Sequence, residues 1–168
     1  MKDVNGDRKG SWSRGVQVPE FSEDHLSNST LIVADQMEPV AAKNVGTGNF
    51  VIGTTKVRPR VPPSDGKPVS FKRTQKLNFW MQVYNLSVDE KTHKASATFE
   101  YDVTDANNKA VIHTVDSTDT MGNVGEQVTL QKTLSAANLQ PGLYKIQIKV
   151  NDNVSKQTVD PSVTFAVE

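Results

Sequence analysis

The chain contains no cysteine, which excludes disulfide bonds, thiolate nucleophiles and sulfur-ligated metal centres together. Small exported domains of eukaryotes usually carry disulfides, so this absence favours a bacterial source. An excess of one charge sign is also missing, because 19 lysines and arginines balance 19 aspartates and glutamates. A neutral chain lacks the bulk attraction that draws basic proteins to nucleic acid or anionic lipid.

Long hydrophobic runs are absent, and none approaches the roughly 20 residues of a membrane-spanning helix. Met1-Lys2-Asp3 leads into a polar stretch, so we expect either a cytosolic chain or a piece of a longer exported protein. The 168 residues, 36% hydrophobic and 23% charged, suffice for one globular domain with a proper core. Helical periodicity is nearly absent as well, and only Ser135–Asn138 is expected to form a single helical turn.

An alternation of apolar and polar residues with period two runs through most of the chain and predicts β-strands. In the clearest example, Leu77, Phe79, Met81 and Val83 share one strand face, and the intervening Asn78, Trp80, Gln82 and Tyr84 share the other. The same pattern predicts strands at 95–103, 110–115, 128–131, 145–150 and 163–167. Polar turns separate these strands, as is typical of antiparallel sheets packed face to face.

Residues 35–76 differ from the rest because they are rich in proline and glycine. Only short strand-like pieces occur there, at 49–52 and 55–58. A structureless loop of this length is unusual in a compact domain. We therefore expect an irregular wrapping segment that covers a sheet edge or one face, with one or two short edge strands.

The segment Leu139-Gln-Pro141-Gly142-Leu-Tyr144 precedes the alternating strand 145–150 and predicts a structural corner. Proline and glycine make the turn, and the tyrosine hydroxyl folds back onto the backbone of the corner while the ring caps the core. Together with the strand pattern, this corner predicts an all-β fold, an immunoglobulin-like antiparallel β-sandwich of seven to nine strands, over residues 19–168.

The N-terminal residues 1–18 have the cadence of the chain's own final hairpin, with a strand end, an Asn/Asp turn and a closing strand. Our hypothesis is that they are the terminal hairpin of a preceding, similar repeat in a longer protein. Asp3-Val-Asn5-Gly-Asp7 also starts like a calcium-binding loop. Arg8 and Arg14, however, occupy the positions where such a loop needs a glycine and a bidentate acid, which favours an ordinary Asn-Gly turn.

Several short phrases occur in an order that resembles a known family. They are Val18-Pro19-Glu20-Phe21, the segment from Leu26 to Ala34, Asn49-Phe50-Val-Ile52-Gly53, the strand from Leu77 to Leu86, and the Pro-Gly-x-Tyr corner. They resemble the C-terminal Ig-like β-sandwich region of exported bacterial, acidobacterial-type GWxTD and von Willebrand factor A-related proteins. The resemblance implies an extracytoplasmic (periplasmic, cell-surface or secreted) accessory module. The family's name motif and any metal-dependent adhesion signature are absent, so no site residue is carried over.

Trp80, Gln82 and Tyr84 form the first candidate ligand site, since the two rings lie on one strand face about 13 Å apart. Rings at that spacing beside an amide can stack on a glycan or on a partner protein. Alternatively, both faces of this apolar strand are buried, the outer one under residues 35–76.

Asp102, Asp105, Asp116 and Asp119 form a second candidate, a calcium site at loop ends. Asx-turn chemistry explains Asp105 and Asp119 equally well.

Residues 56–76 are strongly basic, with Lys56, Arg58 and Arg60 on one strand face, but no aromatic residues interleave as in single-strand nucleic-acid binders. His25, His93 and His113 are scattered, and nucleophile-elbow, zinc-protease and phosphate-loop motifs are missing. We therefore expect a non-enzymatic module without cofactor or nucleic-acid partner, one that binds other domains of the same chain or another protein. The alternative is a carbohydrate-binding module that uses the aromatic strand face.

Overall fold

The protein was analysed as a computed structural model, which describes residues 22, 24–45, 47–48, 50–121 and 125–168. The proposed hairpin at 1–18 and the acidic loop from Asp3 to Asp7 lie outside these residues. The described chain is almost entirely β-structure, and its helical parts are two short 3-10 turns, Ala42–Asn44 and Thr118–Thr120. The single helical turn expected at Ser135–Asn138 is not there, because the chain makes a tight turn in which Leu139 N donates to Ala136 O at 3.0 Å.

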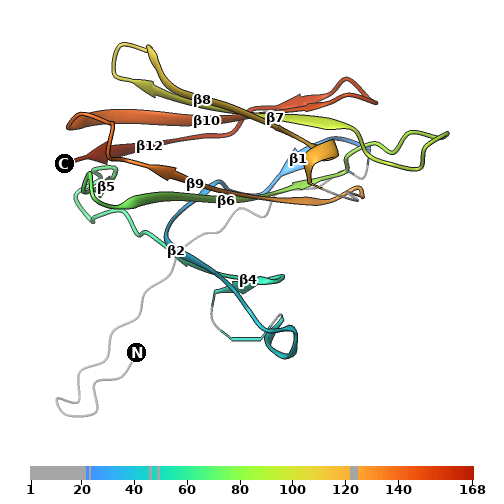
Figure 1. The fold of residues 1–168 in the computed structure, drawn as a ribbon, viewed down its shortest axis with the longest axis horizontal. Helices are drawn as coiled ribbons and strands as arrows, with labels where there is room; N and C mark the ends of the chain where they lie inside the picture. Colours follow the sequence, from blue (N-terminus) through green and yellow to red (C-terminus); the bar gives the residue numbers. More distant parts are fainter. Residues whose placement is uncertain (1–21, 23, 46, 49, 122–124) are drawn as a thin grey trace.

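The strands form two sheets that pack face to face as a β-sandwich (Figure 1). The first sheet contains β1 (Ser27–Asn28), β2 (Ile32–Pro39), β3 (Val51–Ile52), β4 (Thr55–Pro59), β6 (Lys76–Tyr84) and β9 (Val128–Ser135). The second contains β5 (Val69–Phe71), β7 (Ala97–Asp105), β8 (Ala110–Ser117), β10 (Gly142–Asp152), β11 (Thr158–Val159) and β12 (Ser162–Val167). This arrangement confirms the predicted all-β sandwich.

The described chain has twelve strand segments, more than the seven to nine predicted. Three of them, β1, β3 and β11, are only two residues long, and without them nine remain. All six long strands that the alternation predicts are present; β7 is shifted by two residues to Ala97–Asp105, and the others differ from their predicted bounds mainly at their ends. β2 and β5 were not predicted, because β2 changes partner halfway along and β5 is only three residues long.

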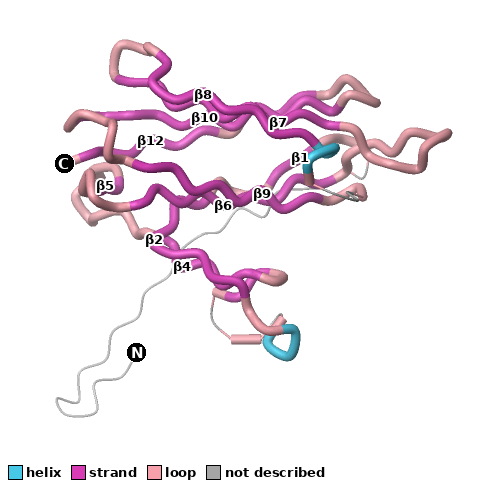
Figure 2. The backbone as a smooth tube through the Cα atoms, in the orientation of Figure 1, coloured by secondary structure: helices cyan, strands magenta, loops and turns pink. Residues whose placement is uncertain are grey.

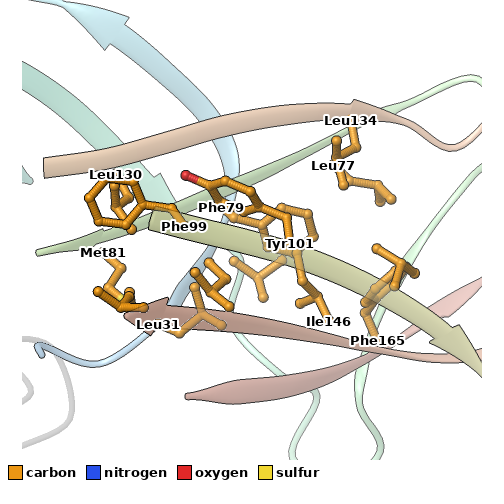
Figure 3. Packing of buried hydrophobic residues seen from close by; sticks show 14 of the residues in the cluster. Leu31, Leu77, Phe79, Met81, Phe99, Tyr101, Leu130, Leu134, Ile146 and Phe165 are labelled. Carbon is orange, nitrogen blue, oxygen red and sulfur yellow. The ribbon is translucent and has the colours of Figure 1, made fainter. Parts of the chain in front are cut away.

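The core lies between the two sheets and contains the inward-facing residues of each long strand. On β6, Leu77, Phe79, Met81 and Val83 are all at most 1% exposed, as the alternation predicts. Phe165 of β12 contacts Phe79 across the sheets, with ring centroids 6.0 Å apart, and Phe71 of β5 edge-on at 6.2 Å. Figure 3 shows Leu77, Phe79, Met81 and Phe165 among the side chains packed between the strands. The aromatic cluster therefore joins both sheets at one end of the sandwich.

Residues 35–59 form a projection that we call the arm, seen below the first sheet in Figure 2. β2 pairs with β6 over Ile32–Ala34, then passes an irregularity before Gln36 and pairs instead with β4. β3 completes the arm by pairing with β4. The arm is the first part of the wrapping segment predicted at 35–76, and it covers the outer face of β6 rather than a sheet edge. The last part of that segment contains β5, which belongs to the second sheet.

The predicted corner is present at the start of β10. The Tyr144 hydroxyl donates to the Gln140 carbonyl at 2.8 Å, and the ring, only 7% exposed, stacks on Phe165 at a centroid distance of 5.7 Å. Leu139 is buried beneath the turn that Pro141 and Gly142 make. The tyrosine therefore holds the connection between β9 and β10 against the core.

Replacing Tyr144 with phenylalanine keeps the ring but removes the hydrogen bond to Gln140. The free energy of unfolding, measured by urea titration, should fall by about 1–2 kcal/mol, because the buried Tyr144 side chain loses its hydrogen bond to the corner. Tyr84→Phe is the matched control, since the Tyr84 hydroxyl donates to the side chain of Gln82 at 2.8 Å in a half-buried place, away from the backbone of the corner. An unchanged unfolding curve for Tyr144→Phe would refute the structural role of the corner.

Candidate interaction groove

Trp80, the first candidate ligand residue, is only 3% exposed. Its ring forms a second hydrophobic cluster with Ala34 and Val57, and Ile32, Met37 and Ile52 pack around them. Val57 belongs to β4 of the arm, and the neighbouring Thr55 accepts a hydrogen bond from Gln131 of β9 at 2.6 Å. The arm thus lies over the outer face of β6 and β9, and the Trp80 ring does not form an exposed platform for a glycan.

Gln82 and Tyr84 remain half-buried and contact each other. The Tyr84 hydroxyl donates to Gln82 Oε1 at 2.8 Å, and Gln82 Nε2 donates to Thr129 on β9 at 3.5 Å. These polar atoms are therefore engaged within the sheet. The aromatic pair expected from the alternation is reduced to one partly exposed tyrosine.

The four candidate calcium ligands are not brought together. Asp102 pairs with His113 at 2.6 Å, and Asp116 pairs with Lys132 of β9 at 2.8 Å. Asp105 accepts hydrogen bonds from the backbone of Asn107 and Lys109, as an Asx turn does. Asp119 lies exposed in the second 3-10 turn. Across the part of the chain that the structure describes, three or more acidic or histidine side chains do not converge anywhere as metal ligands would.

The first three basic residues of the stretch are divided between β4, in the arm, and the point just after β4 where the arm joins the sandwich. Lys56 and Arg58 are exposed on β4, whereas Arg60 pairs with Asp35 at 3.3 Å. The Arg60 guanidinium also lies 4.3 Å from the ring centroid of Phe71, a cation–π contact. Arg60 therefore fixes the base of the arm to the sandwich, and the predicted basic stripe is reduced to two residues.

At the end of the sandwich where β6 leads to β7 and β10 leads to β11, the loops enclose a polar hollow of about 840 Å³. Asp89, Lys94, Asp119 and Lys156 lie in its wall. The loops are held by Asp152, which is 1% exposed and accepts hydrogen bonds from Ser87 N, Val154 N, Ser155 N and Ser155 Oγ at 2.7–3.2 Å. This carboxylate orders two loops, but its bonds leave no oxygen directed at a ligand.

The strongest candidate site is an apolar groove of about 670 Å³ at the other edge of the sandwich. Residues from both sheets and from the proline-rich loop line it, chiefly Leu31, Val33, Pro62, Val69, Leu143 and Val163. Leu31, Val33 and Val69 are buried at its floor, whereas Leu143 is 52% exposed at its rim. Its size lies in the range of ordinary ligand pockets, and its apolar lining is typical of binding sites.

β12 and the start of β2 border the groove, and each has a stretch of backbone there that is not paired with another described strand on the groove side. β5 pairs with β12 only from Phe165 to Val167, so among the described residues Ser162–Thr164 have no strand partner on that side. β4 pairs with β2 only from Ala34 onwards, and Arg60 N donates to Val33 O at 2.9 Å just beyond. Thr30–Ile32 therefore also lack a described strand partner on the groove side. Unpaired backbone beside an apolar floor is a template for an extended chain.

The charged residues at the groove are already paired. Arg60 contacts Asp35, and Lys67 contacts Asp65 at 2.8 Å. Because its charges are compensated, the groove selects for apolar surface rather than for a charged ligand. Sequence reasoning missed the groove because its walls come from segments more than 100 residues apart. The signal available in the sequence was Leu143, an apolar residue at a position of β10 where the alternation places the side chain on the face away from the core.

Comparisons with known proteins do not assign a family. No family model matches the sequence, and no curated protein matches it either. Among solved structures, the chain is similar to a β-glucosidase from Listeria innocua, at 16% identity and a TM-score of 0.37, over 80% of this chain and 21% of the glucosidase. It is also similar to a putative β-galactosidase from Bacteroides fragilis, at 15% identity and a TM-score of 0.32, over 75% of this chain and 22% of that protein.

The chain thus spans about a fifth of the length of these two proteins. A third solved structure, a structural-genomics target, matches 86% of this chain and 87% of its own length, at 11% identity and a TM-score of 0.30. Likeness at this level carries no argument about activity. In the described part of the chain, no helix has the length and apolarity needed to cross a membrane.

Replacing Trp80 with alanine removes the ring that joins the arm to β6. The free energy of unfolding should fall by about 3–5 kcal/mol, the usual cost of deleting a buried aromatic side chain. Hydrogen exchange at the Val57 amide, which bonds Phe50 O at 2.8 Å, should accelerate as the arm loosens. Trp80→Phe is the control and should cost less, because a smaller aromatic ring still fills most of the site and the Nε1 donor, which has no described partner, is removed. Intact stability together with lost glycan retention would instead identify the ring as a ligand platform.

Replacing Asp152 with asparagine should weaken the loop end and change the acid sensitivity of the fold. Burial raises the pKa of Asp152, but hydrogen bonds from Ser87, Val154 and Ser155 outweigh it and hold the pKa below its ordinary value. Since the unfolded pKa is about 3.9, the contribution to stability is complete above that pH and is lost as pH falls through the lower folded value.

Unfolding free energies measured from neutral pH down to pH 3 should therefore decline less steeply for Asp152→Asn than for the native chain. Asp160→Asn is the matched control, because the exposed Asp160 accepts one hydrogen bond from Gln147 at 3.1 Å. Equal slopes for the native chain and Asp152→Asn would contradict the proposed role of the carboxylate.

Proposed function

We propose that the chain is a non-catalytic, protein-binding accessory module of a larger exported bacterial protein. In this proposal the sandwich is immunoglobulin-like, and it binds an extended segment of another polypeptide in the apolar groove. The resemblance of the sequence to exported GWxTD and von Willebrand factor A-related proteins supports the extracytoplasmic location.

The strand connections support the immunoglobulin-like assignment. β2 pairs antiparallel with β6 in the first sheet, while β5, the next strand to join the sandwich itself, pairs parallel with β12 in the second. The two early strands β2 and β5 thus belong to different sheets. The Tyr144 hydroxyl bonds the backbone four residues upstream at the start of β10, as in the tyrosine corner of immunoglobulin-type domains.

The placement of the histidines supports a non-catalytic role. His113 pairs with Asp102, but the imidazole is 56% exposed on the open outer face of the second sheet. His25 contacts Ser22 at 3.2 Å in an exposed turn, and His93 lies in the loop after β6. General acid–base chemistry depends on groups that converge on one enclosed reacting atom, and these three histidines occupy separate exposed surfaces.

The groove between the unpaired stretches Thr30–Ile32 and Ser162–Thr164 is the observation that carries the proposal. Its floor is apolar, its charged residues are compensated, and each wall is a strand whose backbone lacks a described partner on that side. An extended polypeptide satisfies both requirements at once, because its backbone pairs with the strand edge and its alternate side chains enter the groove.

The test uses a seven-residue peptide that alternates threonine and valine, titrated into the isotope-labelled full chain and followed by NMR. Chemical-shift changes should gather at Thr30–Val33 and Ser162–Thr164. The same peptide with proline at its centre should bind at least tenfold more weakly, because proline removes a backbone donor. Shifts located elsewhere, or no shifts at all, would overturn the proposal.

Leu143→Glu should abolish these shifts without unfolding the chain, since the side chain is exposed at the groove rim. Val45→Glu is the matched control, because Val45 is a similarly exposed apolar residue of the arm that does not line the groove. A β-linked disaccharide is titrated in parallel. Saturable shifts with the sugar and none with the peptide would favour the carbohydrate-binding alternative.

A further inference from the structure

We propose a second interaction surface, in which β8 pairs antiparallel with β8 of a second copy of this chain. The two strands are related by a two-fold axis at His113, so that Val111 of each copy faces Val115 of the other. The second sheets of the two copies then form one continuous sheet. This surface lies at the opposite edge of the sheet from the groove and does not depend on the proposed function.

β8 is an edge strand. It pairs along its length with β7, and no other described strand pairs with it. Figure 1 shows it along the upper border of the second sheet, away from β5 and β12. With eight residues it is long for an edge, and its outer side presents a row of unpaired backbone groups.

β8 has few of the usual protections of an edge strand. Natural edges carry lysine, proline, a bulge or an inward charge. Ala110–Ser117 contains neither lysine nor proline, and its inward charge, Asp116 opposite the buried Phe99, is neutralised by Lys132 of the other sheet. Its two titratable side chains are already engaged, Asp116 with Lys132 at 2.8 Å and His113 with Asp102 at 2.6 Å. The register irregularity of the β7–β8 pair makes Val111 the extra residue between Ala110 and Ile112, and it leaves Ile112–Ser117 regular.

Two exposed valines give the edge its apolar character. Val111 is 41% exposed and Val115 is 53% exposed, and with His113 they lie on the outward parity of β8. Single exposed valines are common on protein surfaces. Two on one edge strand that contains neither lysine nor proline, spaced evenly about His113, form a surface that can pair with itself.

The register follows from the positions of the valines. In an antiparallel pair centred at His113, residue 111 of one copy lies opposite residue 115 of the other. The two-fold axis repeats this contact, so that each of the four valines has a valine opposite it. Centring the pair at residue 112 or 114 places Val111 opposite His113 or Ser117 and leaves a valine without an apolar neighbour. Cross-strand pairs of β-branched residues stabilise sheets, so the register at His113 is preferred.

This self-complementarity is why the occupant is a second copy rather than an unrelated strand. A two-fold axis brings the same patch of both copies together, and the contact closes after two chains because each β8 is then used. Edge pairing of this length covers a small area, so the association is expected to be weak and dependent on protein concentration.

The first test is analytical ultracentrifugation of the full chain over the micromolar to millimolar range. The native chain should shift reversibly from monomer to dimer. Val111→Lys should weaken the dimer at least about tenfold, because the new charge is buried against the partner's valine. Adding Val115→Glu to that variant should restore association, since each introduced lysine then faces an introduced glutamate across the axis. Within one chain these two positions are about 13 Å apart and do not pair.

Val61→Lys is the matched control, because Val61 is a valine 81% exposed in the proline-rich loop. It should dimerise like the native chain. A native chain that stays monomeric at every concentration would overturn the proposal. Growth beyond the dimer without saturation would also overturn it, because the two-fold contact closes. Association of the native chain that Val111→Lys leaves unchanged would place the interface elsewhere.

The second test measures the register directly and uses the absence of cysteine from the chain. His113→Cys places the only thiol on the proposed axis, where opposed Cα atoms lie about 4.5–5.5 Å apart, within reach of a disulfide. Under mild oxidation this variant should form a covalent dimer on a non-reducing gel much faster than Val115→Cys or Val61→Cys. Faster cross-linking at residue 115 than at 113 would refute the register, and equal rates at all three would refute the interface.

Discussion

The burial of β6 on both faces is the constraint on which the rest of this structure depends. Its inward residues, from Leu77 to Val83, contact the second sheet, while Trp80 on the other face lies under the arm. A strand with only one covered face alternates apolar and polar residues, and β6 instead buries Leu77–Met81 without a break. The sandwich and the arm are therefore fixed to each other through one strand.

The position of the arm follows from a change of partner within β2. The first part of β2 pairs with β6 and the later part pairs with β4, so the first sheet curls over its own outer face. The chain must then return from the arm to the second sheet, and the proline-rich segment 59–68 makes this return. The same segment forms one wall of the groove. The arm that covers Trp80 and the groove beside β12 are thus two results of one excursion of the chain.

The sequence predicted those parts of the fold whose signals are local. Alternation located the six long strands, and the Pro-Gly-x-Tyr pattern located the corner, because in each case neighbouring residues determine the geometry. The burial of Trp80 was one of two interpretations of its strand, and the apolar run from Leu77 to Tyr84 favoured it. The change of partner in β2 and the short β5 could not be predicted, since both depend on strands that are distant in the sequence.

The candidate sites were less predictable than the fold for a related reason. Asp102, Asp105, Asp116 and Asp119 lie on neighbouring elements, but their sequence does not show that each already has its own partner or faces solvent. A metal site needs convergent ligands, and convergence is a property of tertiary structure. The groove is the reverse case, because its lining residues look like ordinary core residues in the sequence. They form a site only because the neighbouring strand is missing beside them in the described part of the chain.

The second sheet has two edges of different chemistry, and the difference determines what each can bind. The β12 edge is partly covered by β5 and opens into an apolar groove, which suits an extended segment whose side chains need a pocket. The β8 edge has no pocket, so a partner strand gains only backbone pairing and cross-strand contacts there. Such a flat edge discriminates poorly between strands of other proteins. The valines placed symmetrically about His113, however, favour pairing of β8 with β8 of a second copy. Because the edges lie at opposite ends of the strand order, pairing at β8 leaves both grooves open.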